Sequence, residues 1–514
     1  MRRDKKPMLR RTLVVGLTLG LAVGMFSSCG DSGSSTAAPG TGSVFILLGD
    51  TPFADILSAR MSFYRLNLVP VGSDTGRAAL PMSLFARPDI AGLRDSLTIL
   101  SIASLETTTY DRADIFFAIP NLSLVDPTQD PPVNTIFGKI VSSSTMFNIE
   151  PPLVLAKNKF NALRVDFDML RSIRVDAQGQ VTGTINPVFN VTPLAASADG
   201  HLAEFDDLVG FVQSVNTTNT TGANPNFIGS FVMQLLASTG IPVTVNVTSP
   251  NLYGPSAFNR MLTGSVIEME GYVDTNGNVV ANTVLDEQGN TVNAMEIEGV
   301  ADINQNLIAF MGTVLSVTKD ASGRVTGFNL FATDIEPDPT VAGTFLDSIV
   351  TVDASAVPTY KYSSRATNFA NPPLSFDPTT IVPGQQVSVM GTYVQTHDLN
   401  TGKFGAAATA QNIYLRLQTV QGSYASSVQV GSDDKTGAFI LTPASSLLRQ
   451  APVIVFTSPK TKFVDLVGLS ALAPNHILLA RGLLFYERQA TTINGVPVPA
   501  GTTVVLAKQV HQLR

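Results

Sequence analysis

Residues 261–273 read MLTGSVIEMEGYV, and residues 381–394 read IVPGQQVSVMGTYV. The two stretches align at Gly264 with Gly384 and at Gly271 with Gly391. Between the glycines, apolar residues recur at the two-residue spacing of a strand that buries one face. The repetition predicts two copies of one small β-domain, and this prediction decides the fold class.

Further segments recur in the same order around these stretches. GFVQSV at 210–215 precedes VTVNV at 243–247 in the first unit, and GTVLSV at 312–317 precedes IVTVD at 349–353 in the second. A third and fainter unit contains ILLARGLLF at 477–485 and TVVLA at 503–507. Each unit offers about five or six strands in about 100 residues, which fits a small closed barrel because closure removes exposed sheet edges.

A second recurring signal is a hairpin turn written Asp, two residues, Gly, between segments rich in apolar and β-branched residues. Asp accepts backbone N–H groups at the start of such a turn, and Gly takes the left-handed position that closes it. The pattern occurs at Asp176–Gly179, Asp274–Gly277, Asp286–Gly289, Asp320–Gly323 and Asp434–Gly437, with a longer relative at Asp398–Gly402. These turns predict adjacent antiparallel strands.

Composition agrees with this prediction. Charged residues make up only 14% of the chain, and Thr, Val, Asn, Ser and Gly are abundant, which favours strands over helices. Short helical turns are expected within Phe53–Ser62, Asp89–Ser96 and Pro255–Leu262. We therefore expect an all-β protein with an N-terminal antiparallel β-sandwich, followed by two or three small β-barrel-like repeats.

The N-terminus has the pattern of an export signal. Six basic residues and one acid lie in residues 1–11, and TLVVGLTLGLAVGMF at 12–26 carries no charge. A membrane-spanning helix needs about 20 apolar residues, so this segment is short for a permanent anchor. The following FSSCG at 26–30 resembles the bacterial lipobox, with Phe26 where Leu is most common. That resemblance implies that Cys29 receives diacylglycerol and becomes the mature N-terminus.

Cys29 is the single cysteine of the chain, so no disulfide can form within it. An ordinary signal peptide with a chance cysteine is the alternative interpretation. Gly30 follows Cys29 where lipoproteins of the inner membrane commonly have Asp, so the resemblance implies an outer membrane, if the cell has one. We expect a lipid-anchored protein of the cell envelope.

Loss of residues 1–28 would change the net charge from −7 to −12, because six basic residues and one acid leave with them. Phosphate binding needs clustered Lys and Arg, so we expect no nucleic-acid partner. The expected partners are the membrane, through the lipid, and an envelope protein or polysaccharide.

The chain divides into a signal peptide, a glycine-rich tether, a β-sandwich and three repeats. The expected bounds are 1–28, 29–42, 43–195, 205–298, 307–417 and 418–514.

Two family resemblances accompany these patterns. VFILLGDTP at 44–52, YDRADIF at 110–116, LRVDFDMLRSI at 163–173 and NPVFNV at 186–191 resemble the exported domain of unknown function 4382. The repeats from residue 210 resemble domain of unknown function 5666, with its order of G-x-V-x-x-V and G-x-x-V-x-V-x-G. The resemblances imply a β-sandwich and barrel-like repeats on an anchored exported protein, and they imply no reaction.

Asp166 and Asp168 are the strongest candidates for chemistry. They lie two residues apart, so on a strand they share one face, where paired carboxylates can bind Ca²⁺ or act as acid and base. The alternative is that they accept bonds from backbone N–H groups or from Ser172 where the strand ends. Asp50 is expected to cap the turn that leaves the first strand.

Other motifs are incomplete. DTNGN at 274–278 imitates the start of a calcium loop, but Val279 and Leu285 stand where that loop requires Gly and Glu, so a hairpin turn is preferred. The four histidines have no metal-ligand spacing to one another or to Cys29. We expect no enzyme and no cofactor, but a binding or scaffold protein with an unknown ligand. The alternative is an envelope hydrolase or calcium-dependent protein that uses Asp166 and Asp168.

Overall fold

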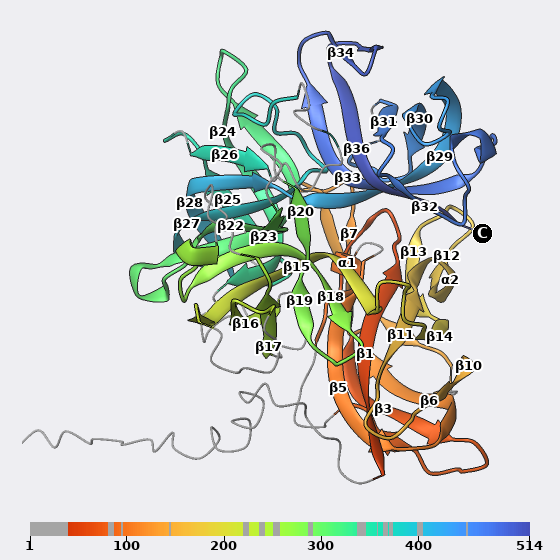
Figure 1. Ribbon diagram of the computed structural model, residues 1–514. Helices are drawn as coiled ribbons and strands as arrows, with labels where there is room; N and C mark the ends of the chain where they lie inside the picture. The colour runs from red at the N-terminus through yellow and green to blue at the C-terminus, as the bar shows by residue number, and fades with distance from the viewer. Residues whose placement is uncertain are drawn as a thin grey trace, which may run out of the picture.

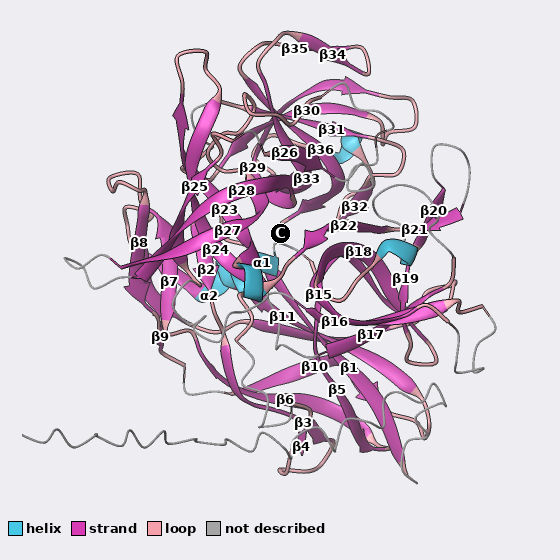
Figure 2. Cartoon of the chain, turned by 90° about the vertical axis from the view of Figure 1, so that its left-hand side faces the viewer, coloured by secondary structure: helices cyan, strands magenta, loops and turns pink. Residues whose placement is uncertain are grey.

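The computed structural model describes residues 40–513, except for short gaps. The gaps are 81–86, 94–95, 143–144, 219–225, 236–241, 250–257, 286–290, 337–345, 357, 363–368, 370–373, 398–403 and 449–450. The expected signal peptide, Cys29 and almost all of the tether lie outside the described residues. The fold of the described residues is nearly all β, as predicted, with 64% of residues in strands and helices confined to short segments (Figure 2).

The N-terminal domain is built on one eight-stranded sheet, coloured red to yellow in Figure 1. Its strands in spatial order are β4 (Arg77–Ala78), β3 (Ser62–Pro70), β6 (Thr109–Ala118), β10 (Met146–Val154), β14 (Phe189–Leu194), β11 (Phe160–Asp168), β1 (Thr41–Thr51) and β5 (Thr98–Glu106). β1 runs parallel to β11, and β10 runs parallel to β14. The sheet is therefore mixed, and the expectation of a purely antiparallel sheet is corrected in this respect.

Two small sheets pack on the same core as the large one. They are β2 (Ile56–Ala59) with β7 (Asn121–Val125) and β8 (Val133–Phe137), and β12 (Ile173–Val175) with β13 (Val181–Ile185) and β9 (Lys139–Ile140). Ile46 of β1 and Val165 of β11 face this core together with Leu122 of β7 and Ile185 of β13. The neighbours on β1, such as Phe45, face the opposite side of the sheet and pack elsewhere.

Three barrels follow, and all have one topology. In each, the first strand pairs with the second and the fourth, and the third strand runs parallel to the fifth, which pairs with the fourth. This is the strand order of the OB-fold, a five-stranded Greek-key barrel. Barrel 1 uses β15 (His201–Asn216), β16 (Gly229–Leu235), β17 (Pro242–Val247), β18 (Ser265–Asp274) and β19 (Val279–Ala281). Barrel 2 uses β23 (Leu307–Lys319), β24 (Val325–Glu336), β25 (Ser348–Asp353), β27 (Gln386–His397) and β28 (Phe404–Leu415). Barrel 3 uses β29 (Leu417–Val430), β30 (Gly437–Pro443), β31 (Val453–Thr457), β33 (Ile477–Glu487) and β36 (Thr502–Gln512).

Accessory strands extend the barrels. They are β22 (Met295–Val300), β26 (Thr359–Tyr362) and β32 (Lys462–Val464), with hairpins of β20 (Thr283–Leu285) and β21 (Thr291–Asn293) and of β34 (Thr491–Ile493) and β35 (Val496–Val498). Residues 417–512 thus form a third unit of the same kind, although the sequence signal there is faint.

One glycine of the fourth strand is equivalent in all three barrels. The first-strand residues Gly210, Gly312 and Gly422 pair with Ile267, Val387 and Leu478, and four residues beyond these partners stand Gly271, Gly391 and Gly482. The fourth strands of barrels 2 and 3 are bulged at Gly391 and Gly482 where they pair with the fifth strands. A Cβ at either glycine would overlap a carbonyl oxygen of the fifth strand. Glycine therefore lets the fourth strand bend and close the barrel.

Three of the predicted hairpin turns have the expected geometry. Asp176, Asp274 and Asp320 each accept two backbone N–H groups, and the closing glycines have φ of 79°, 81° and 82°. The prediction at Asp434–Gly437 is wrong. Asp433 accepts Thr436 N at 2.8 Å instead, and Gly437 is the first residue of β30. Residues 286–289 and 398–402 lie outside the described residues, but the strands on either side of each pair antiparallel as predicted.

The helical predictions had mixed outcomes. The segment Asp89–Ser96 contains α1 (Ile90–Leu93), and Pro255–Leu262 contains the 3₁₀ turn η1 (Phe258–Arg260). The prediction at Phe53–Ser62 is wrong, because Ile56–Ala59 form β2 and pair with β7. Among the described residues, no helix has the length and apolar character needed to cross a membrane.

Apolar contacts cross the boundaries between domains. Phe45 and Leu47 of the N-terminal sheet pack with the core of barrel 1, and Leu57 of β2 packs with Phe331 of barrel 2. Barrel 1 meets barrel 2 through Val266, Ala309, Met311 and Met390. Barrel 2 meets barrel 3 where the Tyr362 and Phe485 rings lie edge to face, with centroids 5.1 Å apart.

Polar contacts join the remaining pairs. Ser446 of barrel 3 donates from its backbone N to Asp55 of the N-terminal domain at 2.7 Å, and Arg481 of barrel 3 lies 3.2 Å from Asp207 of barrel 1. The four domains form six pairs, and each pair is in direct contact. The four domains are therefore packed against one another as one body and do not form a linear array (Figure 1).

Candidate functional site

The structure places the predicted site residues in different roles. Asp166 and Asp168 both lie on β11 and are 7% exposed. Asp166 forms a 2.9 Å ion pair with Arg164, and Asp168 caps α2 (Met169–Ser172) by accepting the backbone N–H of Arg171 at 2.9 Å. Burial raises the pKa of Asp168 above its ordinary range. For Asp168, this bond agrees with the alternative to a metal or catalytic role, in which the carboxylate accepts a backbone N–H group where the strand ends.

The other candidates also lie in turns or strands. Asp50 is the second-last residue of β1 and is fully buried, beside the turn that it is expected to cap. Asp274 closes the β18–β19 hairpin, and its second carboxylate oxygen accepts Asn278 Nδ2 at 2.9 Å. Within the described ranges, no group of three or more His, Cys, Asp or Glu is arranged to hold a metal ion.

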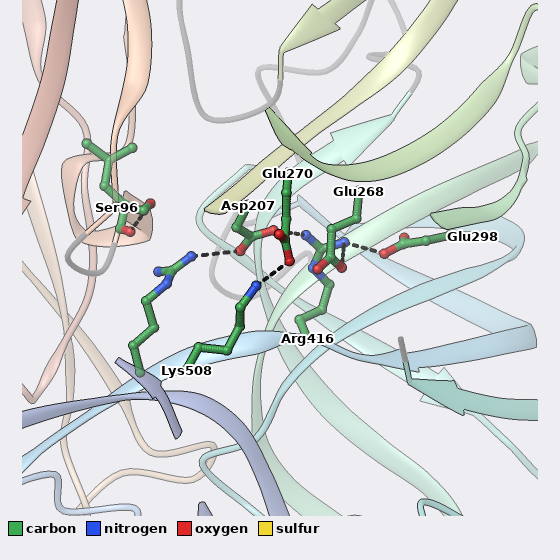
Figure 3. Close-up of polar contacts among 9 residues, drawn as sticks. Ser96, Asp207, Glu268, Glu270, Glu298, Arg416 and Lys508 are labelled. Atoms are coloured by element: carbon green, nitrogen blue, oxygen red, sulfur yellow. Dashed lines mark hydrogen bonds and ion pairs between the residues drawn. The ribbon is translucent and has the colours of Figure 1, made fainter. Parts of the chain in front are cut away.

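The densest group of buried charges lies elsewhere, between barrels 1 and 3 (Figure 3). Barrel 1 supplies Asp207 from β15, Glu268 and Glu270 from β18, and Glu298 from β22. Three cations face them: Arg416 between β28 and β29, Arg481 of β33 and Lys508 of β36. We refer to these seven residues as the charged junction.

Arg416 occupies the centre of the charged junction. Its Nη2 lies 3.1 Å from Asp207 Oδ1, and its Nη1 lies 3.4 Å from Glu268 Oε2 and within hydrogen-bond distance of Glu298 Oε1. Asp207 also forms an ion pair with Arg481, and Lys508 forms an ion pair with Glu270. The side chains of Arg416 and Glu298 are only 8% and 2% exposed, so these charges are held away from bulk water.

The alternation of β18 explains how the carboxylates reach this place. Glu268 and Glu270 are separated by Met269, which points into barrel 1, so both glutamates point outward on the same face. Barrel 3 presents Arg481 from an otherwise apolar strand in the same way. Two outward faces of opposite charge therefore meet.

The charged junction has four carboxyl groups and three cations, so one carboxyl is in excess. Burial raises the pKa of Glu268, Arg416 opposes this shift and the nearby Asp207 and Glu298 add to it, so that the net result is a pKa of about 8. Glu268 therefore keeps a proton at neutral pH, and the remaining three carboxylates balance the three cations. For Arg416, the surrounding carboxylates outweigh burial and raise its pKa, so the guanidinium stays charged.

One position explains how three similar barrels make different contacts. The residue before the equivalent glycine of the fourth strand is Glu270 in barrel 1, Met390 in barrel 2 and Arg481 in barrel 3. Glu270 and Arg481 lie in the charged junction, whereas Met390 packs with apolar residues between barrels 1 and 2. The same outward position thus selects the neighbour by its chemistry.

A cavity of about 100 Å³ adjoins the charged junction where the four domains meet. Asp207, Arg416, Gln386 and Thr333 supply polar groups to its wall, and Ser96 approaches from the N-terminal domain. A polar space of this size holds a few water molecules. The arrangement fixes domain positions, because breaking a buried ion network costs more than its formation contributes.

Sequence reasoning missed the charged junction. The available signals were single charged residues inside apolar strands, such as Arg481 in ILLARGLLF and Lys508 in TVVLAKQV, and the spacing of Glu268 and Glu270. A charged residue in a strand that is buried on both faces must find a partner. The signal does not name the partner, since Arg416 and Asp207 lie 209 residues apart.

Comparisons with known proteins add little. No family model matches the sequence, and no curated protein matches it. Among solved structures, the chain is similar to a single-stranded DNA binding protein from Thermus aquaticus, with 11% sequence identity over 41% of this chain and 91% of that chain. The TM-score is 0.12, and a likeness at this level carries no argument about this protein.

Proposed function

We propose that the protein is an exported, lipid-anchored component of the cell envelope, whose four β-domains act together as one rigid, non-catalytic scaffold or binding platform. The single observation that supports a rigid platform is the direct contact within all six pairs of domains. Such packing presents loops from several domains in fixed relative positions, as a scaffold requires.

The proposed lipid anchor is supported by the sequence of the N-terminus. Cys29 follows a basic and then apolar segment and precedes a glycine-rich stretch that ends where β1 begins at Thr41. A flexible segment of this composition separates a folded body from lipid headgroups. The resemblance to the two domains of unknown function stays a prediction that agrees with this location.

The charges support a partner other than nucleic acid. The mature chain would carry a net charge of −12. Of its cations, Arg416, Arg481 and Lys508 are buried against carboxylates in the charged junction. They are therefore not displayed for phosphate groups, whose binding depends on exposed Lys and Arg. An envelope protein or polysaccharide fits the proposal better.

Replacement of Cys29 tests the anchor. The Cys29→Ala variant should leave the membrane pellet or stay there only with an uncleaved signal, whereas wild type should carry a diacylglycerol mass on its mature N-terminus. A Ser28→Ala variant is the control, because it keeps the cysteine and a small residue before it. An unchanged mass and unchanged detergent partitioning after Cys29→Ala would contradict the proposal.

A further inference from the structure

The end of the N-terminal domain at which the chain enters has a distinct surface. The backbone N of Thr107 donates to Gly40 O at 2.9 Å, and that of Asn158 donates to Thr41 O at 3.1 Å. The turn from β5 to β6 and the loop from β10 to β11 therefore both contact the start of β1, which lies at the bottom of the molecule in Figure 1. We call this region the entry end, defined by Val71, Val154, Lys157 and Lys159.

Two exposed valines lie close together at the entry end. Val71 follows β3 and donates its backbone N–H to Thr109 O at 2.9 Å, and Val154 of β10 pairs with the same Thr109 across β6. Their exposed fractions are 56% and 64%. An exposed apolar side chain is ordinary when it stands alone, but two at neighbouring strand ends form a small apolar tip.

The charge of the entry end differs from that of the whole chain. Lys157 and Lys159 are both exposed beside the start of β1, and Asp74 is exposed nearby. The other charged side chains of this end are paired, Arg77 with Glu106 at 3.0 Å and Arg112 with Asp111 at 3.3 Å. The entry end is thus weakly basic on a mature chain of net charge −12.

The length of the preceding chain places this surface near lipid. Eleven residues lie between Cys29 and Thr41, so the chain makes twelve residue-to-residue steps from one to the other. Twelve such steps span at most about 40 Å in any conformation, and a glycine-rich random coil of that length has a root-mean-square end-to-end distance of about 19 Å. A short tether of this kind gives a local concentration in the millimolar range, so weak contacts suffice to orient the body.

We propose that the entry end rests on the anionic phospholipid surface that holds the lipid anchor, with Val71 and Val154 at the headgroups and Lys157 and Lys159 facing lipid phosphates. This inference rests on the proposed anchoring. The lipid retains the protein at the membrane, and the entry end sets its orientation. Barrel 3 lies at the opposite end of the molecule from the start of β1 (Figure 1), so it then faces away from the bilayer.

Fluorescence quenching by brominated lipids tests the orientation. The lipidated full chain is reconstituted into phosphatidylcholine vesicles with or without phosphatidylglycerol, and an environment-sensitive dye is attached to Val154→Cys. Cys29 does not react, because its sulfur is consumed by the lipid thioether. A dye at Val467→Cys is the control, since Val467 is 82% exposed and belongs to barrel 3.

The proposal expects at least a twofold loss of fluorescence at position 154 on anionic vesicles and little loss at position 467. Equal quenching at both positions, or none at position 154, would overturn it. If mass spectrometry finds no lipid on Cys29, the proposed anchoring fails and this inference fails with it. A lipidated protein with an unquenched label at position 154 contradicts the orientation alone.

A charge reversal tests the phosphate contact. Lys157→Glu combined with Lys159→Glu should abolish the additional quenching on anionic vesicles while leaving the melting temperature unchanged, because both side chains are exposed. Lys460→Glu combined with Lys462→Glu is the matched control, with the same charge change at the same spacing on exposed residues of barrel 3. Unchanged quenching after the first pair, or an equal loss after the second, would contradict a basic contact at the entry end.

Discussion

Arg416 Nη2 and Asp207 Oδ1 lie 3.1 Å apart, although 209 residues separate them in the sequence. Asp207 belongs to the first strand of barrel 1, and Arg416 lies between the last strand of barrel 2 and the first strand of barrel 3. The pair therefore fixes three domains relative to one another. Because Arg416 also contacts Glu298, its removal would leave the buried carboxylates of Asp207 and Glu298 without their shared cation.

The first prediction concerns that removal. Arg416→Met should lower the free energy of unfolding by about 3–5 kcal/mol, because breaking a buried ion network leaves uncompensated charge. Urea unfolding measures the change. Arg65→Met is the control, since Arg65 pairs with Asp114 at the surface and is 45% exposed, and it should cost no more than about 1 kcal/mol. Equal losses in the two variants would show that the charged junction does not hold the domains together.

The second prediction concerns pH. The pKa of Glu268 is about 8 in the folded protein, against 4.5 for an ordinary glutamate. Between these values the folded state holds one proton more than the unfolded state, so stability falls as pH rises, by up to about 1.4 kcal/mol per pH unit. This contribution is lost by about pH 8 and is constant above it. Glu268→Gln cannot ionise and should lack this part of the slope.

Urea unfolding of both proteins between about pH 5 and pH 9 measures the difference. Glu106→Gln is the control, because it makes the same chemical change at a side chain that is 62% exposed. This variant should keep the wild-type slope. Parallel stability curves for wild type and Glu268→Gln would contradict a protonated Glu268.

The third prediction concerns Gly391 and Gly482, the bend glycines at which the fourth strands of barrels 2 and 3 are bulged. Gly391→Ala and Gly482→Ala should each cost about 2–4 kcal/mol, because the new methyl group overlaps a backbone carbonyl that cannot move without opening the barrel. Gly299→Ala is the control, since it meets only the flexible side chains of Met390 and Asn412. Thermal unfolding ranks the three variants. A larger loss at Gly299 than at the bend glycines would refute this account of barrel closure.

Features of the fold that depend on a few neighbouring residues were predictable from the sequence. The alignment of Gly264 with Gly384 and of Gly271 with Gly391 predicted two barrels, because closure places a local demand on the backbone that only glycine meets without strain. The turn at Asp176 was predicted for a similar reason, since its carboxylate bonds to the backbone of the next few residues. Local rules of this kind are readable in one sequence.

Longer-range pairings were not readable. A helical turn was expected within Phe53–Ser62, but Ile56–Ala59 of that segment pair with β7 more than 60 residues further along the chain. The turn was predicted to begin at Asp434, but Asp433 is the residue that accepts its backbone N–H groups. Asp434 instead accepts the backbone N–H of Ser470, from a distant segment, at 2.8 Å. The charged junction escaped detection for the same reason, as its cations and carboxylates come from different barrels.

The fourth prediction concerns Asp166 and Asp168. Asp168→Ala should cost about 1 kcal/mol, because it removes the cap that accepts Arg171 N. Calcium should leave the melting temperature of both wild type and the Asp166→Ala, Asp168→Ala double variant unchanged. A calcium-dependent rise in wild type that disappears in the double variant would favour the metal-binding alternative instead.

The fifth prediction tests the central claim that the four domains form one body. Small-angle X-ray scattering from the chain beginning at Gly30 should give a radius of gyration of about 23–26 Å, the size of a compact domain assembly of this length with a short tail. It should not change with added salt, because apolar contacts cross the boundaries together with the ion pairs. A radius well above about 30 Å, or one that grows with salt, would contradict a single rigid platform and indicate domains that move independently.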